Sequence, residues 1–405
     1  MATENELRRV VVVGGGVAGA MAAQTLRSEG FDGELTLVGS ERHAPYHRPA
    51  LSKKLLTGEV HRAGIDMAPQ HAFQARVLRG ADALGLDMAS RSVLVRDGDS
   101  HLTVPFDGLV IANGADVRRW PGGPVPGGVV TLRTVDDCLA IRSSLHRRTR
   151  VVVVGGGFIG TEVAASLCST GHDVTLLSRA GALLHSALGE KMGSCWTDLH
   201  RQHGVDVRVG VEVEGFVGKR RVKAVRLSDG SKVKADLVIL GLGVEPATDW
   251  LQGSGIRVDR GVVCDATGAA EGATGVVAAG DVARWWHPIY GQHLRIEHWD
   301  QASRQGVTAA RNLLAGPDRA QEYDAVPYFW SDQFDVKLQL IGIPSGYDSV
   351  EIVEGSGRGR AFTAAYAKDG QTIAVLSTIP GRVGDYRGAV SQRASFPPCL
   401  SPEPV

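Results

Sequence analysis

One pattern of apolar and small residues occurs twice along this chain. Residues 10–13 are four consecutive valines, which is typical of a buried strand of a parallel sheet. Glycines follow, and the small and apolar residues of 20–26 then favour a helix. The same order returns at 151–167, where four valines precede three glycines and an alanine-rich helical segment. The sequence therefore predicts two separate strand–turn–helix units of an α/β fold.

The glycine spacing in both units fits a dinucleotide-binding turn. In G-x-G-x-x-G, the first glycine makes the tight turn, the second admits a pyrophosphate and the third lets the helix approach the strand. The pyrophosphate then lies at a helix N-terminus, where free N–H groups favour an anion. Two such sites suggest a flavin that stays bound and a nicotinamide that exchanges. The candidate contacts are Gly14, Gly16, Ala18 and Gly19 in the first turn, and Gly155, Gly157, Phe158, Ile159 and Gly160 in the second.

The ends of the next strands bear on which cofactor is bound. Strand 34–38 ends at Ser40 and Glu41, where an acid about 20 residues beyond the glycines typically bonds a ribose; a solvated loop is the alternative. Strand 173–177 ends at Ser178 and Arg179. An acid at that position repels a 2′-phosphate, whereas serine and arginine can hold one. We therefore expect NADPH to be used at least as well as NADH, unless Arg179 simply points into water.

Composition narrows the class of protein. A length of 405 residues suits two or three domains. The formal net charge is zero, so we expect no nucleic-acid or membrane partner. The N-terminus lacks the pattern of a signal peptide, and no apolar run is long enough to span a membrane. The five cysteines are dispersed without a C-x-x-C pair, which predicts no metal site and favours a reducing cytoplasm.

Several further segments carry a family resemblance. Segment 45–53 reads PYHRPALSK, segment 276–283 ends a buried strand in Gly-Asp, and segment 327–334 reads PYFWSDQF. Together with the two glycine-rich turns, they resemble the FAD-dependent ferredoxin reductases, which are the NAD(P)H-driven reductases of putidaredoxin, rubredoxin and dioxygenase ferredoxins. The resemblance extends from residue 9 to about residue 390. Two departures are Asn113, where threonine is usual, and Val117, where proline is common.

The resemblance implies a set of site residues. The lysine matching Lys53 lies near the flavin ring, and the glutamate matching Glu162 lies beside the nicotinamide. We take both as catalytic candidates and expect an ion pair between them across the domain interface. A glutamate that only serves the helix dipole is the alternative for Glu162. The other implied FAD contacts are Arg48, Ala83, Ala112, Arg133, Asp281 and Trp299, and Gly243 is implied to lie near the nicotinamide.

The resemblance also implies the architecture, which is glutathione-reductase-like. Two Rossmann-like domains bind FAD and NAD(P)H, and a smaller α+β domain follows. We expect the FAD domain at 1–115 and 245–324, with the NAD(P)H domain at 116–244 inserted between. The C-terminal domain is expected at 325–405, with a disordered tail after about 393. Within it, Trp330 is either a core residue or faces the partner.

The implied activity is that of an FAD-dependent NAD(P)H:ferredoxin oxidoreductase. Its partner would be a ferredoxin or rubredoxin that serves a cytochrome P450 or a Rieske dioxygenase. A disulfide reductase or NADH oxidase on the same fold needs a cysteine beside the flavin, and segment 40–54 has none. Reduction of a small radical or quinone, and a redox-sensing role without turnover, both stay open. The sequence also leaves open whether the chain is a monomer or a homodimer.

Overall fold

The computed structural model describes residues 7–67, 73–356 and 360–398. They form two compact units, of which the first takes its described residues from 1–47, 63–116 and 244–325. The second takes its described residues from 48–62, 117–243 and 326–405. This division differs from the expected domains in two respects. Segment 48–62 was expected in the FAD domain but joins the second unit, and the C-terminal residues were expected to form a domain of their own but pack with 117–243. Among the described residues, no helix is both long and apolar enough to cross a membrane.

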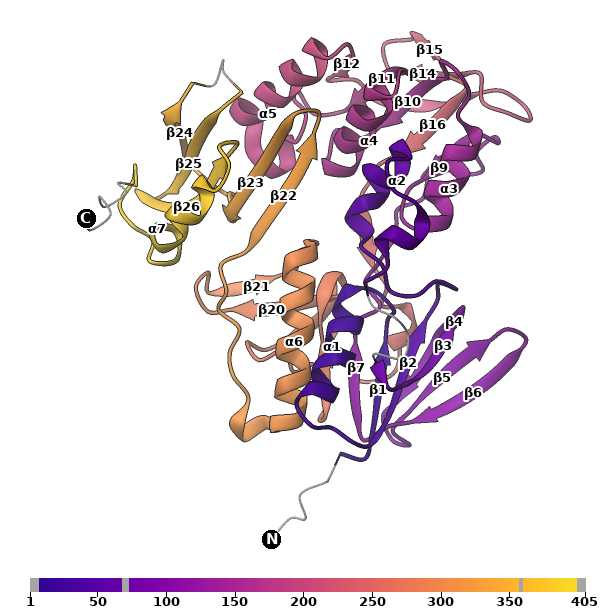
Figure 1. Cartoon of the computed structure of the whole chain (residues 1–405), viewed down its shortest axis with the longest axis vertical. Helices are drawn as coiled ribbons and strands as arrows, with labels where there is room; N and C mark the ends of the chain where they lie inside the picture. The colour runs from indigo at the N-terminus through magenta and orange to yellow at the C-terminus, as the bar shows by residue number, and fades with distance from the viewer. Residues whose placement is uncertain (1–6, 68–72, 357–359, 399–405) are drawn as a thin grey trace. The chain divides into compact units, whose positions relative to one another are not determined.

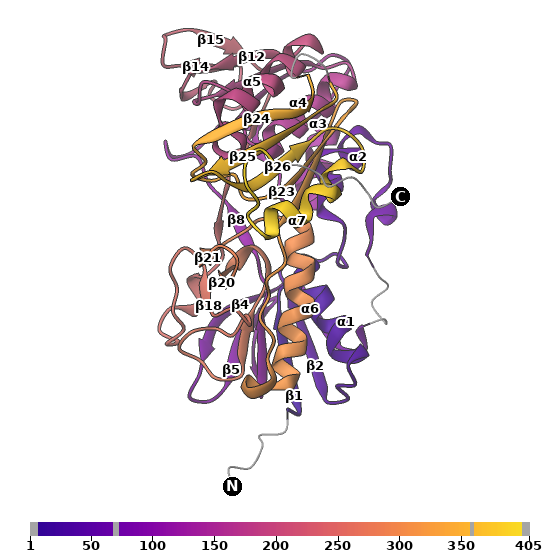
Figure 2. The ribbon, with the colours of Figure 1, turned by 90° about the vertical axis from the view of Figure 1, so that its left-hand side faces the viewer.

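A five-stranded parallel sheet with the order β19-β7-β1-β2-β3 forms the centre of the first unit. Its strands are β19 (Val276–Ala278), β7 (Gly108–Ile111), β1 (Arg9–Val13), β2 (Glu34–Gly39) and β3 (Arg76–Arg79). Helices α1 (Val17–Ser28) and α6 (Trp299–Ala315) lie side by side against it (Figure 1, Figure 2). They approach closely because Gly306 lacks a side chain: a Cβ there would lie 2.3 Å from the carbonyl oxygen of Ala18.

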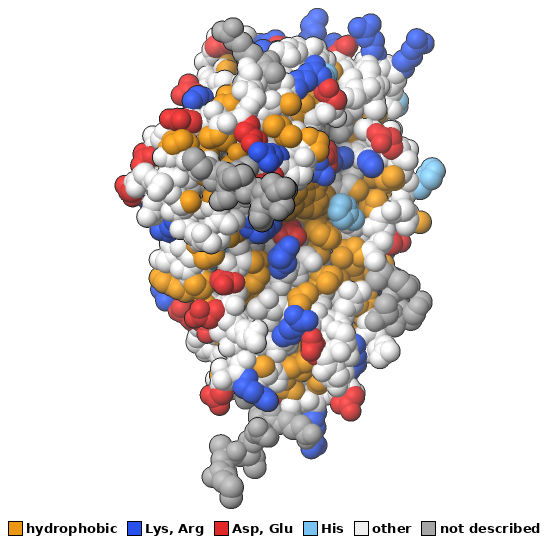
Figure 3. Space-filling view, turned by 60° about the vertical axis from the view of Figure 1, so that its left-hand side comes forward, with side chains coloured by type: hydrophobic (Ala, Val, Ile, Leu, Met, Phe, Trp, Pro, Cys, Tyr) orange, Lys and Arg blue, Asp and Glu red, His pale blue; other side chains and the backbone are white. Residues whose placement is uncertain are grey.

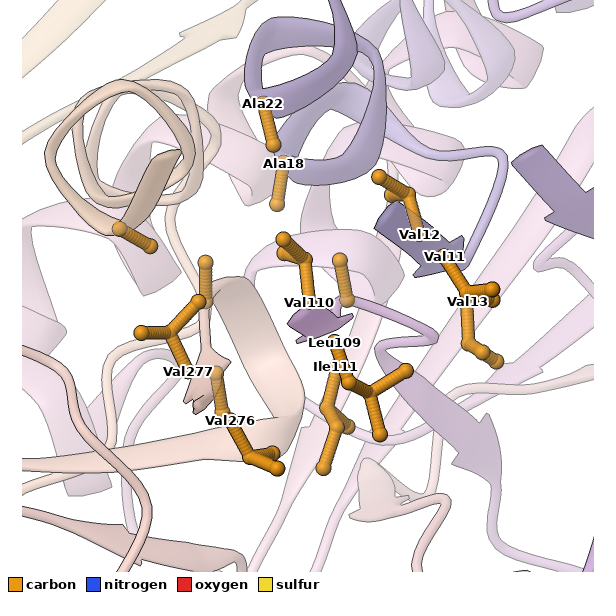
Figure 4. Packing of buried hydrophobic residues seen from close by; sticks show 14 of the residues in the cluster. Val11, Val12, Val13, Ala18, Ala22, Leu109, Val110, Ile111, Val276 and Val277 are labelled. Atoms are coloured by element: carbon orange, nitrogen blue, oxygen red, sulfur yellow. The ribbon is translucent and has the colours of Figure 1, made fainter. Parts of the chain in front are cut away.

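The core of the first unit covers both faces of this sheet. Figure 4 shows Val110 of β7 pointing towards Ala18 of α1, whereas Ile111 points to the opposite face. The four valines of β1 are all buried, as are Leu109 to Ile111 of β7. Burial on both faces is the reason that these strands are continuous apolar runs instead of alternating ones.

Smaller elements complete the first unit. A hairpin turns at Asp97-Gly98, where β5 and β6 pair and Gly98 has a φ of 60°. Two three-stranded sheets have the orders β4-β5-β6 and β18-β20-β21, and β8 pairs with β17. The strands are β4 (Ala81–Asp87), β5 (Ser92–Asp97), β6 (Ser100–Pro105), β8 (Ala115–Val117), β17 (Val244–Pro246), β18 (Val262–Cys264), β20 (Ala283–His287) and β21 (Gln292–Leu294). Short 3-10 helices are η2 (Arg62–Ile65), η4 (Asp249–Leu251), η5 (Gly280–Val282) and η6 (Pro317–Arg319).

The second unit repeats the parallel plan with the order β12-β11-β10-β16-β9. Its strands are β12 (Asp206–Val209), β11 (Asp173–Ser178), β10 (Arg150–Val154), β16 (Leu237–Leu240) and β9 (Val129–Thr131). Its helices are α3 (Val135–Ser144), α4 (Phe158–Ser169) and α5 (His185–Gln202). The short η1 (Arg48–Ser52) and α2 (Lys54–Thr57) pack against α3 and α4, which explains why 48–62 belongs to this unit. A small sheet of β13 (Val213–Val217), β14 (Ala224–Leu227) and β15 (Lys232–Lys234) shares a hydrophobic core with the parallel sheet.

The C-terminal residues of the second unit form an antiparallel sheet with the order β22-β23-β26-β25-β24. Its strands are β22 (Tyr328–Gln333), β23 (Val336–Gly342), β24 (Ser349–Gly355), β25 (Phe362–Lys368) and β26 (Gln371–Ser377). Helix α7 (Arg387–Ser391), which follows η7 (Arg382–Tyr386), lies beside β23 and β26 (Figure 2).

The start of the expected disordered tail is bonded to this sheet. The N–H of Thr372 donates to the carbonyl of Ala394 at 2.8 Å, and the N–H of Phe396 donates to Gly370 at 3.0 Å. Residues 394–396 are therefore held in place, unlike the prediction. Residues 399–405 lie outside the described part of the chain.

Charges of both signs are mixed on the surface. On the face shown in Figure 3, blue and red side chains are interspersed among the described residues, without a broad area of one sign. This mixture agrees with the formal net charge of zero.

Candidate functional site

The first glycine-rich turn has the shape that the sequence predicts. A Cβ on Gly14 would lie 2.1 Å from the carbonyl oxygen of Ala112, and one on Gly19 would lie 1.9 Å from the oxygen of Gly14. A Cβ on Gly16, in contrast, would meet no atom within 4 Å. Gly16 caps α1 without a side-chain hydrogen bond. The first N–H groups of α1 are therefore available to an anion in an open space.

The second turn repeats this geometry. A Cβ on Gly155 would lie 2.1 Å from the oxygen of Gly241, and one on Gly160 would lie 1.9 Å from the oxygen of Gly155. Gly157 has no atom within 4 Å of such a Cβ and caps α4 without a side-chain hydrogen bond. The neighbouring Phe158 is partly exposed, and Ile159 is 48% exposed. Both units thus present an uncapped helix N-terminus beside a crowded glycine turn.

The acidic candidate of the first unit lies just beyond β2. Glu41 is partly exposed, and its Oε2 accepts a hydrogen bond from the buried Tyr46 hydroxyl at 2.6 Å. Ser40 beside it is exposed. Tyr46 therefore orients the carboxylate at the end of the strand, which sequence reasoning did not foresee.

Further polar groups of the first unit are Asp281, His298, Trp299 and His47. Asp281 follows β19 in η5, and Trp299 begins α6. The rings of Trp299 and His47 lie with centroids 5.1 Å apart. Burial lowers the pKa of His298 to about 4, while the negative charge of Asp281 opposes this shift. His298 is therefore neutral at physiological pH and can act as donor at one ring nitrogen and acceptor at the other.

The remaining predicted FAD contacts divide between the units. Ala112 lies at the end of β7, with its N–H donating to the oxygen of Val13 at 2.7 Å, and Ala83 lies in β4. Arg48 and Arg133 both lie in the second unit, contrary to the expected domain limits for Arg48. The guanidinium of Arg48 donates to the carbonyl oxygen of Arg133.

The expected ion pair is present around a buried carboxylate. Lys53 Nζ lies 2.6 Å from Oε2 of Glu162, whose residue is 3% exposed. The Ser52 hydroxyl donates to the same oxygen at 2.5 Å, and the Ser331 hydroxyl donates to Oε1 at 2.6 Å. Both charged residues belong to the second unit, so the pair does not bridge two domains as predicted.

Local packing brings these groups together. The Ser166 hydroxyl of α4 donates to the carbonyl oxygen of Ser52 at 2.7 Å, which ties η1 to the helix that carries Glu162. Sequence reasoning missed Ser52 and Ser331 as partners of this carboxylate. The local signal for Ser331 is only that it follows three aromatic residues in β22. Its role becomes clear when β22 packs on α4.

The two residues predicted to select between NADH and NADPH differ in exposure. Ser178 ends β11 and is 5% exposed, whereas Arg179 is exposed. A Cβ on Gly156 would lie 2.7 Å from the Ser178 hydroxyl, which places this hydroxyl beside the glycine turn. Gly243 follows β16 with a φ of 87°, and its carbonyl accepts from the N–H of Arg118 at 3.0 Å.

The described cysteines are thiols without a disulfide partner. Burial raises the pKa of Cys138 to about 11 and also raises the pKa of Cys264. The Cys138 thiol donates to the carbonyl of Leu51 at 3.3 Å. Thiols held protonated in this way are poor nucleophiles. Among the residues that the structure describes, no group of three or more histidines, cysteines or acids could hold a metal.

Comparison with known proteins first defines the class. Residues 8–306 match the family "Pyridine nucleotide-disulphide oxidoreductase", and residues 328–398 match "Reductase C-terminal". The first match covers both glycine-rich turns and both parallel sheets. The chain is thus an oxidoreductase of this class, with the C-terminal sheet as its second family element.

Individual relatives narrow the class further. The ferredoxin–NAD(+) reductase component of an anthranilate 1,2-dioxygenase system from Burkholderia cepacia is 35% identical, over 98% of this chain and 97% of that protein. Putidaredoxin reductase from Pseudomonas putida is 34% identical, over 90% of this chain and 87% of that protein. In a crystal structure of a covalent putidaredoxin reductase–putidaredoxin complex, a chain superposes with a TM-score of 0.90 at 31% identity, covering 95% of this chain and 93% of that chain. The chain therefore belongs to the FAD-dependent NAD(P)H:ferredoxin reductases.

Proposed function

We propose that this chain transfers electrons from NAD(P)H through FAD to a ferredoxin- or rubredoxin-type carrier, which in turn serves a cytochrome P450 or a Rieske dioxygenase. The observation that carries the proposal is the duplicated turn. Each unit offers one uncapped helix N-terminus beside an open glycine. A dinucleotide pyrophosphate fits such a position in each unit. FAD would supply the chemistry that accepts a hydride and releases single electrons.

We assign FAD to the first unit. Glu41, which accepts a hydrogen bond from the Tyr46 hydroxyl, would accept one from a ribose hydroxyl as well. Asp281 follows β19, a strand at one end of the parallel sheet of the first unit. Its carboxylate would hold the ribityl chain of FAD. His298 interacts electrostatically with Asp281, and Trp299 follows it at the start of α6. Their neutral rings would border the flavin without adding charge. Ala83, Ala112, Arg48 and Arg133 remain proposed FAD contacts.

We assign NAD(P)H to the second unit. Gly155, Gly157 and Gly160 shape the pyrophosphate site, with Phe158, Ile159 and Gly243 as further proposed contacts. Lys53 and Glu162 would orient the nicotinamide and the flavin so that hydride transfer needs no side chain as acid or base. Their ion pair, with Lys53 Nζ 2.6 Å from Glu162 Oε2, holds the ammonium and the carboxylate in one arrangement.

We propose further that NADPH is used at least as well as NADH. Support comes from Ser178, which adds no negative charge at the end of β11, and from the exposed Arg179, whose guanidinium can reach a 2′-phosphate. The ratio of kcat/KM for the two donors measures this preference. A preference for NADH of about tenfold or more, equal to about 1.4 kcal/mol, would contradict the assignment.

The state of the cysteines favours a carrier reductase over a disulfide reductase. Burial holds the described thiols above their usual pKa, so they lack the thiolate that sulfur chemistry needs. Free thiols also suit a reducing compartment, and we therefore propose the cytoplasm as the location.

Anaerobic titration of the purified protein tests the proposal. We expect a yellow protein whose absorbance bleaches on addition of NADPH or NADH. Reduction of cytochrome c should then rise strongly when a ferredoxin or rubredoxin is added. A colourless protein, or one that no donor bleaches, would refute the function. Bleaching with equal cytochrome c reduction in the presence and absence of every carrier would favour a reductase of small radicals or quinones instead.

A further inference from the structure

One face of β22 matches one face of α4 residue by residue. Phe329, Ser331 and Gln333 occupy alternate positions of the strand, and Phe158 and Glu162 lie one turn apart on the helix. Two residues of a strand advance about 6.6 Å and four residues of a helix about 6 Å, so the two spacings coincide. The ring centroids of Phe329 and Phe158 are 4.2 Å apart, and the Ser331 hydroxyl donates to Glu162 at 2.6 Å.

The hydrogen bonds of this contact have a defined direction. Gln333 Nε2 donates to the Ser331 hydroxyl oxygen at 3.0 Å, and the Ser331 hydroxyl donates to Oε1 of Glu162. A carboxylate can only accept and a hydroxyl has one proton. The single proton of the Ser331 hydroxyl is therefore donated to Glu162. The serine oxygen then acts as the acceptor for the Gln333 amide. Glu162, Ser331 and Gln333 are 3%, 0% and 1% exposed, so water does not compete for these bonds.

The two oxygens of Glu162 are thus held by different parts of the second unit. Oε2 contacts Ser52, the last residue of η1, and Lys53, which follows it. Oε1 accepts a hydrogen bond from Ser331 of the C-terminal sheet. Without the serine hydroxyl, Oε1 would lose its donor in a buried place, and the carboxylate could turn about its last torsion. The orientation of the Lys53–Glu162 pair therefore depends on the C-terminal sheet.

We propose that Ser331, oriented by Gln333, is a positioning residue for the reaction with NAD(P)H, and this inference rests on the function proposed above. Its role is to hold the Glu162 carboxylate in the arrangement that orients the nicotinamide. The C-terminal sheet thereby takes part in the first half of the reaction, in addition to any contact with an electron carrier.

The same sheet supplies a matched control. Ser377 of β26 is also 0% exposed, and its hydroxyl lies 2.9 Å from that of Thr363. Ser377 has no hydrogen bond to Glu162 or Lys53 among those of the described residues. Ser331→Ala and Ser377→Ala each remove one buried hydroxyl from the C-terminal sheet. Only Ser331→Ala removes a hydrogen bond to Glu162.

Anaerobic stopped-flow reduction of the FAD-loaded protein tests the proposal, with the limiting rate and the apparent Kd of NAD(P)H measured separately. We expect Ser331→Ala to lower the limiting rate about tenfold, the effect of one lost hydrogen bond to a charged group. The apparent Kd should change much less, and Ser331→Thr should recover most of the rate because it keeps the hydroxyl. Ser377→Ala should reduce FAD at the wild-type rate.

A double-mutant cycle separates positioning from general destabilisation. If Ser331 acts only through Glu162, Ser331→Ala should have no further effect on the limiting rate in a Glu162→Ala background. Full additivity of the two changes, or equal loss in Ser331→Ala and Ser377→Ala, would overturn the proposal. A wild-type rate in Ser331→Ala would also overturn it.

Two further outcomes are informative. If Ser331→Ala fails to retain FAD, Gln333→Leu serves in its place, because it keeps the serine but removes the donor that directs its proton. We then expect a smaller loss of limiting rate, about threefold, and an unchanged rate would overturn the proposal. If NAD(P)H does not reduce the wild-type protein, the proposed function itself fails. If wild type and Ser331→Ala are reduced at the same rate, only the positioning role of Ser331 fails.

Discussion

Lys53→Met tests how the buried pair contributes to both stability and reaction. The distance of 2.6 Å between Lys53 Nζ and Glu162 Oε2, at an effective dielectric constant of about 20, gives an attraction of about 6 kcal/mol. The desolvation of both charges cancels part of it, and removal of one partner from a buried pair costs about 3 to 5 kcal/mol. Ser52 and Ser331 still hold the carboxylate in the variant. We therefore expect the lower end of that range, about 3 kcal/mol.

The double variant Lys53→Met/Glu162→Gln separates the two contributions. It is neutral at both positions and keeps the shape of both side chains, so we expect its free energy of unfolding to return to within about 1 kcal/mol of wild type. Its reaction with NAD(P)H should stay slow, by about tenfold or more, because neither orienting group is restored. Lys53→Met alone should slow flavin reduction more than it weakens FAD binding.

Urea denaturation followed by circular dichroism measures the stability of each FAD-loaded variant, and stopped-flow absorbance measures the reduction rate. The reasoning on the ion pair would be wrong if the double variant were no more stable than Lys53→Met. The assignment of Lys53 to the reaction would be wrong if Lys53→Met were reduced at the wild-type rate.

Gly157→Ala should raise the KM for NAD(P)H about tenfold with little change in melting temperature, because a Cβ there meets no protein atom within 4 Å; an unchanged KM would contradict the assigned pyrophosphate site. Ser178→Glu should shift the ratio of kcat/KM from NADPH towards NADH by charge repulsion with the 2′-phosphate. Burial lowers the pKa of His200, so the unfolded state binds this proton first, and the free energy of unfolding should fall as the pH drops below about 6.5. Urea denaturation between pH 8 and 5 measures this slope, which should be smaller in His200→Asn.

The sequence by itself determined the two nucleotide-binding turns. A run of four valines followed by glycines favours a strand buried on both faces. The glycine spacing follows from local contacts: the third glycine of each turn lies against the oxygen of the first, where no side chain fits. The positions of Glu41, Asp281 and Ser178 at strand ends follow from the same local order. Chain neighbours within a few residues define all of these features, so one sequence suffices to find them.

Only the tertiary structure decided which distant residues meet. Glu162 bonds Ser52 and Ser331 across separations of 110 and 169 residues, and Arg48 bonds the carbonyl of Arg133. The Lys53–Glu162 pair was expected from the family resemblance, but its place within one unit was not. No local pattern specifies that η1 and β22 both pack against α4. These contacts arise because several apolar faces must be buried at once, and the polar groups between them then take whichever partners that packing brings within reach.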